Sequence, residues 1–333
     1  MNRSSSTLSG ARTSLHLLLL CLCAMVAIAL ALSSGSVTLS LHDVVSVLFS
    51  HADSHSIQYA ILFNLRLPRA LNAFALGGVL ALAGVYMQAL LRNPLADPFI
   101  IGTSGGAAVA ALLAMLLGLG TVAVHGASIA GAFAATLLVF ALAHAEGSWS
   151  PTRLLLTGVI IASGTSAVIT LLLALGDESR LRSMLFWLMG EVSSDSPVVL
   201  CVLLMIGTAF TWILARHLNL LTRGETQAQA LGMNVRRVRI GLFAISSILT
   251  ASAVTSAGTI GFVGLMTPHL ARWLVGADHR RVVPAAVLLG GTLLTLADTA
   301  ARTLFAPHQL PVGALTALIG VPVFLSLMFT RRQ

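Results

Sequence analysis

The chain has 333 residues, of which 57% are hydrophobic and 9% charged, which excludes a soluble domain with its roughly 25% of charged residues and indicates several membrane crossings. All 19 basic residues are arginine, and the absence of lysine excludes a Walker A phosphate-binding loop and Schiff-base chemistry, so any ATP hydrolysis would come from another chain. The net charge of +8 is scattered between apolar segments rather than gathered on one face, which argues against nucleic-acid binding.

Ten apolar segments are predicted as membrane-spanning helices. They cover residues 15–32, 70–91, 98–117, 121–144, 154–175, 197–215, 240–257, 259–275, 283–301 and 310–329. Only Gly118–Gly120 and Gly258 separate the members of two pairs, so we expect two tight hairpins rather than two very long helices. The predicted fold is an all-α polytopic membrane protein with one transmembrane domain over residues 1–333. The first segment could instead be a cleaved secretory signal, although it is long for one.

The distribution of arginine predicts the orientation of these helices. With the N-terminus inside, the cytoplasmic segments hold 14 of the 19 arginines and only four carboxylates. The outside keeps five arginines and seven carboxylates, as the positive-inside rule requires. Both termini are therefore predicted to be cytoplasmic. The outside arginines are Arg66, Arg69, Arg180, Arg182 and Arg302.

Ionisable residues are scarce inside the predicted spans. Asp298 is the nearest case, and Arg302 follows it by four residues, which places both on one helix face. Ion-coupled carriers usually place such groups at membrane depth. Their scarcity argues against an ion-coupled secondary carrier and favours an external energy source. The three cysteines lie in apolar runs and suggest neither disulfides nor a zinc site.

Four segments are distinctive in composition. Arg66-Leu67-Pro68-Arg69 precedes an apolar helix that ends near Gln88, and Pro94 and Pro98 then turn the chain sharply. Small residues at Gly102–Ala107 would let a helix start against a neighbouring backbone.

The third segment, residues 223–237, is the longest polar stretch between spans. We predict a short helix, a stop at Gly232 and a second short helix, on the cytoplasmic side. Its apolar residues Ala228, Leu231 and Val235 are enough to enter a groove on a partner, although a solvated loop is the alternative. The fourth segment, residues 258–272, has glycines at three-residue intervals and Pro268, which would break or kink its helix.

Together with Leu310–Gly313 and Gly320–Phe324, these segments resemble the FecCD-type permeases of bacterial ABC importers, which take up iron–siderophore complexes, haem and vitamin B12. The resemblance runs from about residue 60 to the C-terminus. It implies the type II ABC importer permease fold, ten helices per subunit, a homodimer and the bacterial inner membrane. It also implies two cytoplasmic ATPase subunits, which hold ATP and Mg, and a periplasmic binding protein that delivers the substrate. No cofactor is expected in this chain.

The resemblance assigns roles to three groups of residues. Arg66, Arg69 and Arg302, taken as exposed, would accept acidic side chains of the binding protein. Gly224, Glu225, Ala228, Leu231, Gly232, Val235 and Arg236 would form the coupling helices for the ATPase. The translocation pathway would be lined by the fifth and tenth helices and their dimer mates, with Ser163, Thr165, Ser166, Leu310, Pro311 and Thr316 as candidates. Residues 181–191 are expected to form a short outward helix that caps the pathway.

An intramembrane serine protease that uses Ser104 is a competing hypothesis, because Gly102–Gly105 fits a Gly-x-Ser-Gly pattern. Such an enzyme needs a histidine level with Ser104, and His125, His144 and His269 lie near span ends instead. Neither a catalytic residue nor a metal ligand is therefore assigned. In such systems the permeases share these motifs and selectivity rests mostly with the binding protein. Among substrates we rank iron chelates, including haem, slightly above cobalamin.

Overall fold

The structure is a computed structural model that describes residues 4–35, 37, 39–49, 56–144 and 150–330. Within these residues every regular element is a helix. In chain order they are α1 (Ser4–Ser33), α2 (Leu41–Phe49), α3 (Ile57–Ala60), the π-helix η1 (Ile61–Arg66), α4 (Leu67–Leu91), the 3₁₀ helix η2 (Pro98–Ile101), α5 (Thr103–Leu116), α6 (Thr121–His144), α7 (Pro151–Leu175), α8 (Glu178–Met189), α9 (Val198–Arg223), α10 (Glu225–Ala230), α11 (Val235–Ala257), α12 (Val263–Val275), α13 (His279–Thr303) and α14 (Val312–Thr330).

Each of the ten predicted apolar segments overlaps one long helix, which are α1, α4, α5, α6, α7, α9, α11, α12, α13 and α14. Seven helical stretches of the described chain are long and apolar enough to cross a bilayer by themselves. The other three fall short: α5 has 14 residues, α12 has 13, and α14 counts as a shorter apolar helix over Val312–Ser326. The all-α polytopic class is therefore confirmed, whereas ten crossings and the orientation of the termini stay predictions.

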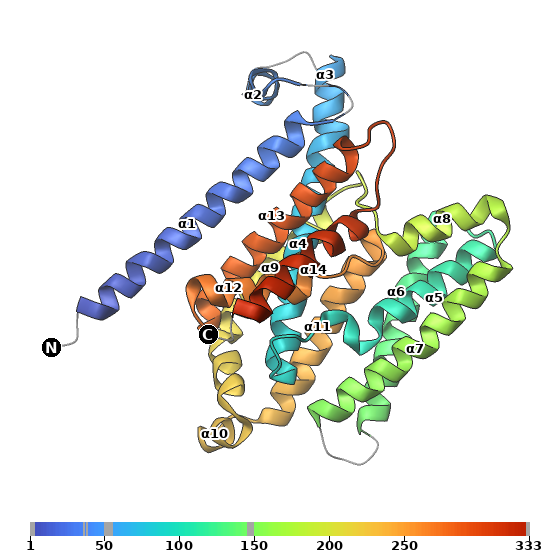
Figure 1. Ribbon diagram of the computed structural model, residues 1–333. Coiled ribbons are helices and arrows are strands. Elements are labelled where there is room, and N and C mark those ends of the chain that lie inside the picture. The colour runs from blue at the N-terminus through green and yellow to red at the C-terminus, as the bar shows by residue number, and fades with distance from the viewer. Residues whose placement is uncertain (1–3, 36, 38, 50–55, 145–149, 331–333) are drawn as a thin grey trace.

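Helix α4 forms the centre of the bundle, surrounded by α9, α11, α12 and α13 (Figure 1). In the most apolar stretch of 18 residues of this helix, 94% of the residues are buried. Glycines allow this close packing, because a Cβ at Gly77 would lie 2.1 Å from the carbonyl oxygen of Gly290 and one at Gly84 1.9 Å from that of Gly264. Small residues bring helix backbones together in this way inside membranes.

Helices α5 to α8 form a second group to one side of α4 (Figure 1). The predicted hairpin is present, with α5 and α6 antiparallel and Gly118 in the left-handed region at φ +71°. The small residues at the start of α5 do meet neighbouring backbone, since a Cβ at Gly106 would lie 2.3 Å from the carbonyl oxygen of Gly131. Helix α7, on the far side of this group, is largely exposed: in its most apolar stretch of 18 residues only 11% of the residues are buried.

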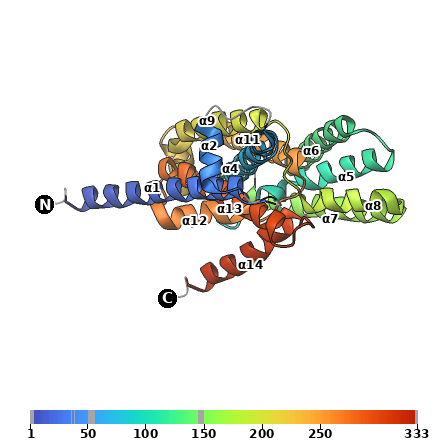
Figure 2. The ribbon, with the colours of Figure 1, turned by 90° about the horizontal axis from the view of Figure 1, so that it is seen from above.

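The second predicted hairpin is wrong, because α11 and α12 follow each other in the described chain but do not pack along each other: α11 lies against α4 and α6, and α12 against α4 and α13. Helix α12 begins at Val263 rather than 259, after Gly258 and Phe262 have both adopted positive φ values of 70° and 68°. Pro268 stays inside a continuous helix, so the predicted break does not occur there. Seen from above, α1 and α14 extend away from the bundle at its periphery (Figure 2).

Candidate functional site

Arg66 lies at the end of the bundle where α4 begins, in the last position of η1. Only 5% of it is exposed. Its guanidinium donates to the carbonyl oxygens of Leu32 at 2.7 Å and Ser33 at 2.9 Å, and to that of Val37. The expectation of a freely exposed guanidinium is therefore wrong for Arg66, because this side chain holds the end of α1 and the following loop against the start of α4.

Arg69 and Arg302 share one buried carboxylate. Asp298 is 1% exposed. Arg69 donates from Nε to Oδ1 and Oδ2 of Asp298 at 3.1 and 3.2 Å, and its terminal nitrogen reaches Oδ1 at 3.0 Å. Arg302 donates from Nε to Oδ2 at 3.1 Å, on the helix face predicted from the four-residue spacing. The sequence did not indicate that Arg69, 229 residues away, completes this cluster.

A cavity of about 380 Å³ opens among the three arginines. Ser194, Gln309 and the loop at Gly35 also line it. Three guanidinium groups and one carboxylate leave the cluster with a net charge of +2. Such a cavity attracts carboxylates, which guanidinium groups bind by charge-assisted, often bidentate hydrogen bonds. The three predicted docking residues are thus neighbours in space, and their role in docking stays a prediction.

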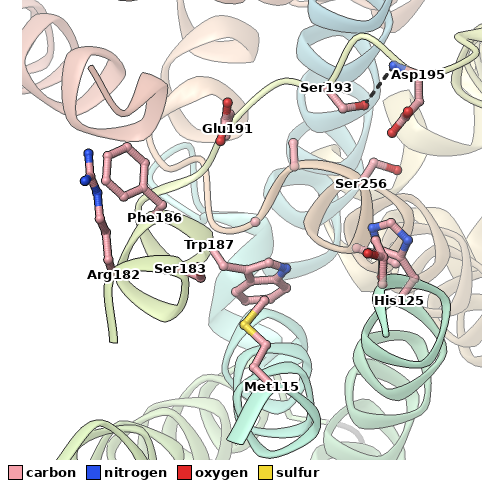
Figure 3. A pocket seen from close by; sticks show the side chains of 14 residues that line it. Met115, His125, Arg182, Ser183, Phe186, Trp187, Glu191, Ser193, Asp195 and Ser256 are labelled. Carbon is pink, nitrogen blue, oxygen red and sulfur yellow. Dashed lines mark hydrogen bonds between the residues drawn. The ribbon is translucent and has the colours of Figure 1, made fainter. Parts of the chain in front are cut away.

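A larger cavity of about 600 Å³ lies beside α8 at the same end (Figure 3). Phe186 and Trp187 of α8 face it together with Met115 of α5 and His125 of α6. Glu191, Ser193 and Asp195 border it from the loop after α8. Among the described residues no group of three or more His, Cys, Asp or Glu side chains is arranged to hold a metal ion. The lining suits contact with apolar or aromatic surface more than metal ligation.

Most of residues 181–191 form a helix, since α8 spans Glu178–Met189 and ends at Gly190 with φ +81°, and its outward position stays a prediction. Backbone contacts tie this end to two other helices. The amide of Glu191 donates to the carbonyl oxygen of Ala257 at 2.9 Å, and that of Val312 donates to the carbonyl oxygen of Gly190 at 3.2 Å. The outer ends of α8, α11 and α14 therefore meet at Gly190.

The predicted pathway residues lie in two different environments. On α7, Ser163 and Ser166 are exposed, whereas Thr165 is partly buried beside Gly105. At the start of α14, Thr316 is buried and donates to the carbonyl oxygen of Gly313 at 2.9 Å. Leu310 and Pro311 are half-buried just before that helix. Within this single chain the exposed candidates are therefore Ser163 and Ser166.

The polar segment 223–237 lies at the end of the bundle opposite the arginine cluster (Figure 1). Its first half is the predicted short helix, α10, and Gly232 adopts φ +80° as the predicted stop. The second half differs from the prediction, because Val235 and Arg236 belong to the first turn of the long helix α11.

The apolar residues of this segment do not all face outward. Ala228 and Val235 are buried against the bundle, whereas Leu231 is 68% exposed. A partner could therefore contact Leu231, Gly232 and Arg236 directly, whereas Ala228 and Val235 hold the segment on the bundle.

Other polar contacts organise the inner end. Gln88 donates to the carbonyl oxygen of Leu265 at 2.9 Å and accepts from Arg272. Asp278 caps α13 and accepts from Asn219 at 2.7 Å. Burial acts to raise the pKa of Asp278, but the hydrogen bonds from Asn219 and the Arg280 amide hold its pKa below the usual range.

The chain was compared with known proteins. Residues 22–330 match the model of the FecCD transport family. The hemin transport system permease protein of Yersinia pestis is 39% identical over 291 residues, which cover 85% of this chain and 87% of that one. The cobalamin import system permease protein of Halobacterium salinarum is 40% identical over 280 residues, which cover 81% and 74%.

A solved structure shares the whole arrangement of helices. It is an ABC transporter assigned to the metal-chelate type and described as inward-facing, with a TM-score of 0.82 and 34% sequence identity. The superposition covers 95% of this chain and 99% of that one. The matched region includes the arginine cluster, the cavity beside α8 and the segment around α10.

Proposed function

Because the chain belongs to the FecCD transport family, we propose that it is the permease subunit of an ABC importer that carries an iron chelate, either a siderophore or haem. Cobalamin is the second candidate substrate. The chain is a multi-pass protein of the bacterial inner membrane. Its relatives include permeases named for hemin and for cobalamin, which supports both classes and favours neither on identity alone.

The proposed topology has ten crossings with both termini in the cytoplasm. The positions of arginine support it, because Arg92, Arg272, Arg280 and Arg281 gather at the inner end, with α10. Helices α5 and α12 are short, and counting both as crossings preserves the alternation of chain direction on which the orientation depends.

The proposed partners follow from the two ends of the bundle. Two cytoplasmic ATPase subunits, which bind ATP and Mg, would contact α10, since this chain has no lysine for a Walker A loop. A periplasmic binding protein would dock on the arginine cluster through carboxylates. A second copy of the chain would complete the pathway beside α7, whose exposed apolar residues include Leu156, Ile160 and Leu171.

One observation carries this proposal. The cationic cavity and the segment around α10 lie at opposite ends of one helix bundle, with the buried helix α4 between them (Figure 1). An importer needs a contact for a substrate donor on one face and a contact for a motor on the other. Neither alternative explains both, because a protease or an ion-coupled carrier needs no motor at α10.

The test is uptake in a strain from which the gene has been deleted. Labelled haemin, ferrichrome and cyanocobalamin are offered separately, and the gene is restored on a plasmid. We expect the loss of uptake of one iron chelate and its return with the plasmid. Loss of cyanocobalamin uptake alone would support the second candidate, and unchanged uptake of all three would overturn the importer proposal.

Two further arms separate the alternatives. A Walker A lysine variant of the ATPase should abolish uptake, whereas uptake that persists and follows an ion gradient would identify a secondary carrier. The substitution Ser104→Ala should leave uptake intact. Loss of a proteolytic activity in that variant, with normal uptake, would favour the protease.

A further inference from the structure

Helix α10 is too short to hold its own position. It has six residues, and isolated helices shorter than about 12 residues are marginal even in favourable sequences. Gly224 and Gly232 flank it with φ values of +126° and +80°. No atom lies within 4 Å of a Cβ added at either glycine. The space beside both glycines is therefore open, and the backbone hydrogen bonds there are local, from the amide of Gly224 to Leu221 and from that of Gly232 to Gln229. Side-chain contacts must then decide how α10 lies on the bundle.

One ion pair joins α10 to the long helix α11. Arg239 donates to Oε1 of Glu225 at 3.3 Å and to Oε2 at 2.9 Å. Both carboxylate oxygens and both terminal guanidinium nitrogens take part, so the pair constrains orientation as well as distance. Ala228, in the middle of α10, is buried against the bundle and supplies the apolar part of the contact.

The burial of Arg239 makes Glu225 hard to replace. Arg239 is 3% exposed, and the residues beside it include the apolar Leu90, Leu91 and Leu154. Among the described residues, Glu225 supplies the one carboxylate within 4 Å of this guanidinium. A buried guanidinium without a partner carries a large desolvation penalty. The pair therefore favours the arrangement in which α10 lies on α11.

Helix α11 reaches the outer end of the molecule. Its last residue, Ala257, accepts a hydrogen bond from the amide of Glu191 at 2.9 Å. A Cβ added at the next residue, Gly258, would lie 2.1 Å from the carbonyl oxygen of Trp187. Between the two ends, Ser246 donates to the carbonyl oxygen of Ala83 in α4 at 3.2 Å. The helix that holds α10 is thus also in contact with α8 and the cavity in Figure 3.

We propose that Arg239 is a positioning residue that fixes the ATPase-contacting helix α10 on α11 through Glu225, so that a displacement of α10 moves α11 and its outer contact with α8. The inference rests on the proposed function, in which α10 meets the ATPase. Without the pair, α10 would pivot at its two glycines while α11 stayed in place. ATP hydrolysis would then continue with little transport.

The experiment uses the complete importer, with its ATPase and binding protein, in proteoliposomes. Glu225→Gln, Arg239→Gln and the reversed pair Glu225→Arg with Arg239→Glu are compared with wild type. Two rates are measured: ATP hydrolysis, and uptake of whichever of haemin, ferrichrome and cyanocobalamin the wild-type complex carries. Arg216→Gln is the matched control, because it removes an exposed arginine of α9 that lies outside the segment 223–237.

We expect each single variant to lower the amount carried per ATP hydrolysed by roughly 2- to 30-fold, the usual range for residues in a coupling network. Hydrolysis itself should stay near the wild-type rate. The reversed pair should recover a substantial part of the loss, which a merely structural defect at either position would not do. The inference is wrong if the single variants carry as much per ATP as wild type, or if the reversed pair is no better than them.

Amide hydrogen exchange of the assembled complex gives a second measurement that needs no transport. In Glu225→Gln, whose altered side chain is partly exposed, the amides of α10 should exchange faster while those in the middle of α11 do not. Unchanged exchange in α10 would overturn the inference even if an Arg239 variant failed to assemble.

Leu231→Asp separates this inference from the proposed function. If the ATPase still binds the variant normally, α10 is not the contact and the proposed function of this segment fails. If Leu231→Asp releases the ATPase while Glu225→Gln behaves as wild type, only the positioning role fails.

Discussion

Arg69 and Asp298 form a bidentate ion pair that joins the start of α4 to the outer end of α13. Arg302 donates a further hydrogen bond to Oδ2 of the same carboxylate. A buried ion pair contributes little net stability over an apolar pair, but it is strongly destabilising to break. Its benefit here is geometric, because Asp298 fixes two guanidinium groups at the border of one cavity while their net charge stays positive.

The first prediction concerns this carboxylate. Asp298→Asn would leave Arg69 and Arg302 in a largely buried site without a counter-charge, and we expect the free energy of unfolding to fall by about 3 kcal/mol. The measurement is thermal unfolding of the purified protein in detergent. Asp43→Asn is the control, because the Asp43 side chain is 39% exposed and its hydrogen bonds are local, to Ser40. Equal midpoints for the two variants would contradict the prediction.

The second prediction concerns the charge of the cavity rather than its framework. Gln309 borders the cavity, is exposed and carries no charge. Gln309→Glu should slow association of the binding protein severalfold at low ionic strength, and Gln309→Arg should speed it, because charges at an interface steer encounter. Surface plasmon resonance on the permease in nanodiscs measures both rates.

Salt provides the control for that measurement. Added salt should reduce the difference between the two Gln309 variants, since it screens charges separated by more than about 8 Å at physiological ionic strength. A binding protein that associates equally fast with both variants at low salt would exclude this cavity as the docking site.

The third prediction tests the packing around α4. Gly84→Ala would place a methyl group 1.9 Å from the carbonyl oxygen of Gly264, a backbone atom that cannot move aside cheaply. We expect a loss of about 3 kcal/mol or failure to assemble. Gly241→Ala, in α11, meets no atom within 4 Å and should be neutral or stabilise the helix by up to about 1 kcal/mol. Thermal unfolding and the yield of monodisperse protein distinguish the two outcomes.

The pattern of apolar residues along the chain predicts the helices well, because a long apolar segment in a membrane can form few structures other than a helix. The same pattern does not predict contacts between side chains that are far apart in the sequence. The sequence shows Asp298 as a carboxylate inside a span, and its ion pair with Arg302 follows from helix periodicity. Its stronger link to Arg69 has no local signal, because it depends on how α13 packs against α4.

The start of α11 differs from the prediction for a related reason. Arg236, Arg237 and Arg239 make the first turns of this helix polar, so composition placed the start of the apolar helix at residue 240. The structure resolves the apparent conflict, because Arg239 is buried with Glu225 as its partner. A charged residue in a helix can belong to the packed interior when its counter-charge comes from another segment.

The last prediction tests whether the open face of α7 lines a water-filled pathway. Ser163 and Ser166 are exposed, and Val168, on the other side of the helix, is 40% exposed. Cys21, Cys23 and Cys201 are first replaced by alanine, and one cysteine is then placed at each of the three positions of α7.

A thiol reacts as thiolate, which forms in water and not in lipid. A charged methanethiosulfonate reagent should therefore modify cysteine at 163 and 166 much faster than at 168, and a bound chelate should slow the reaction at the first two positions. Equal rates at all three would mean that lipid or a dry interface, and not a pathway, covers this face of α7.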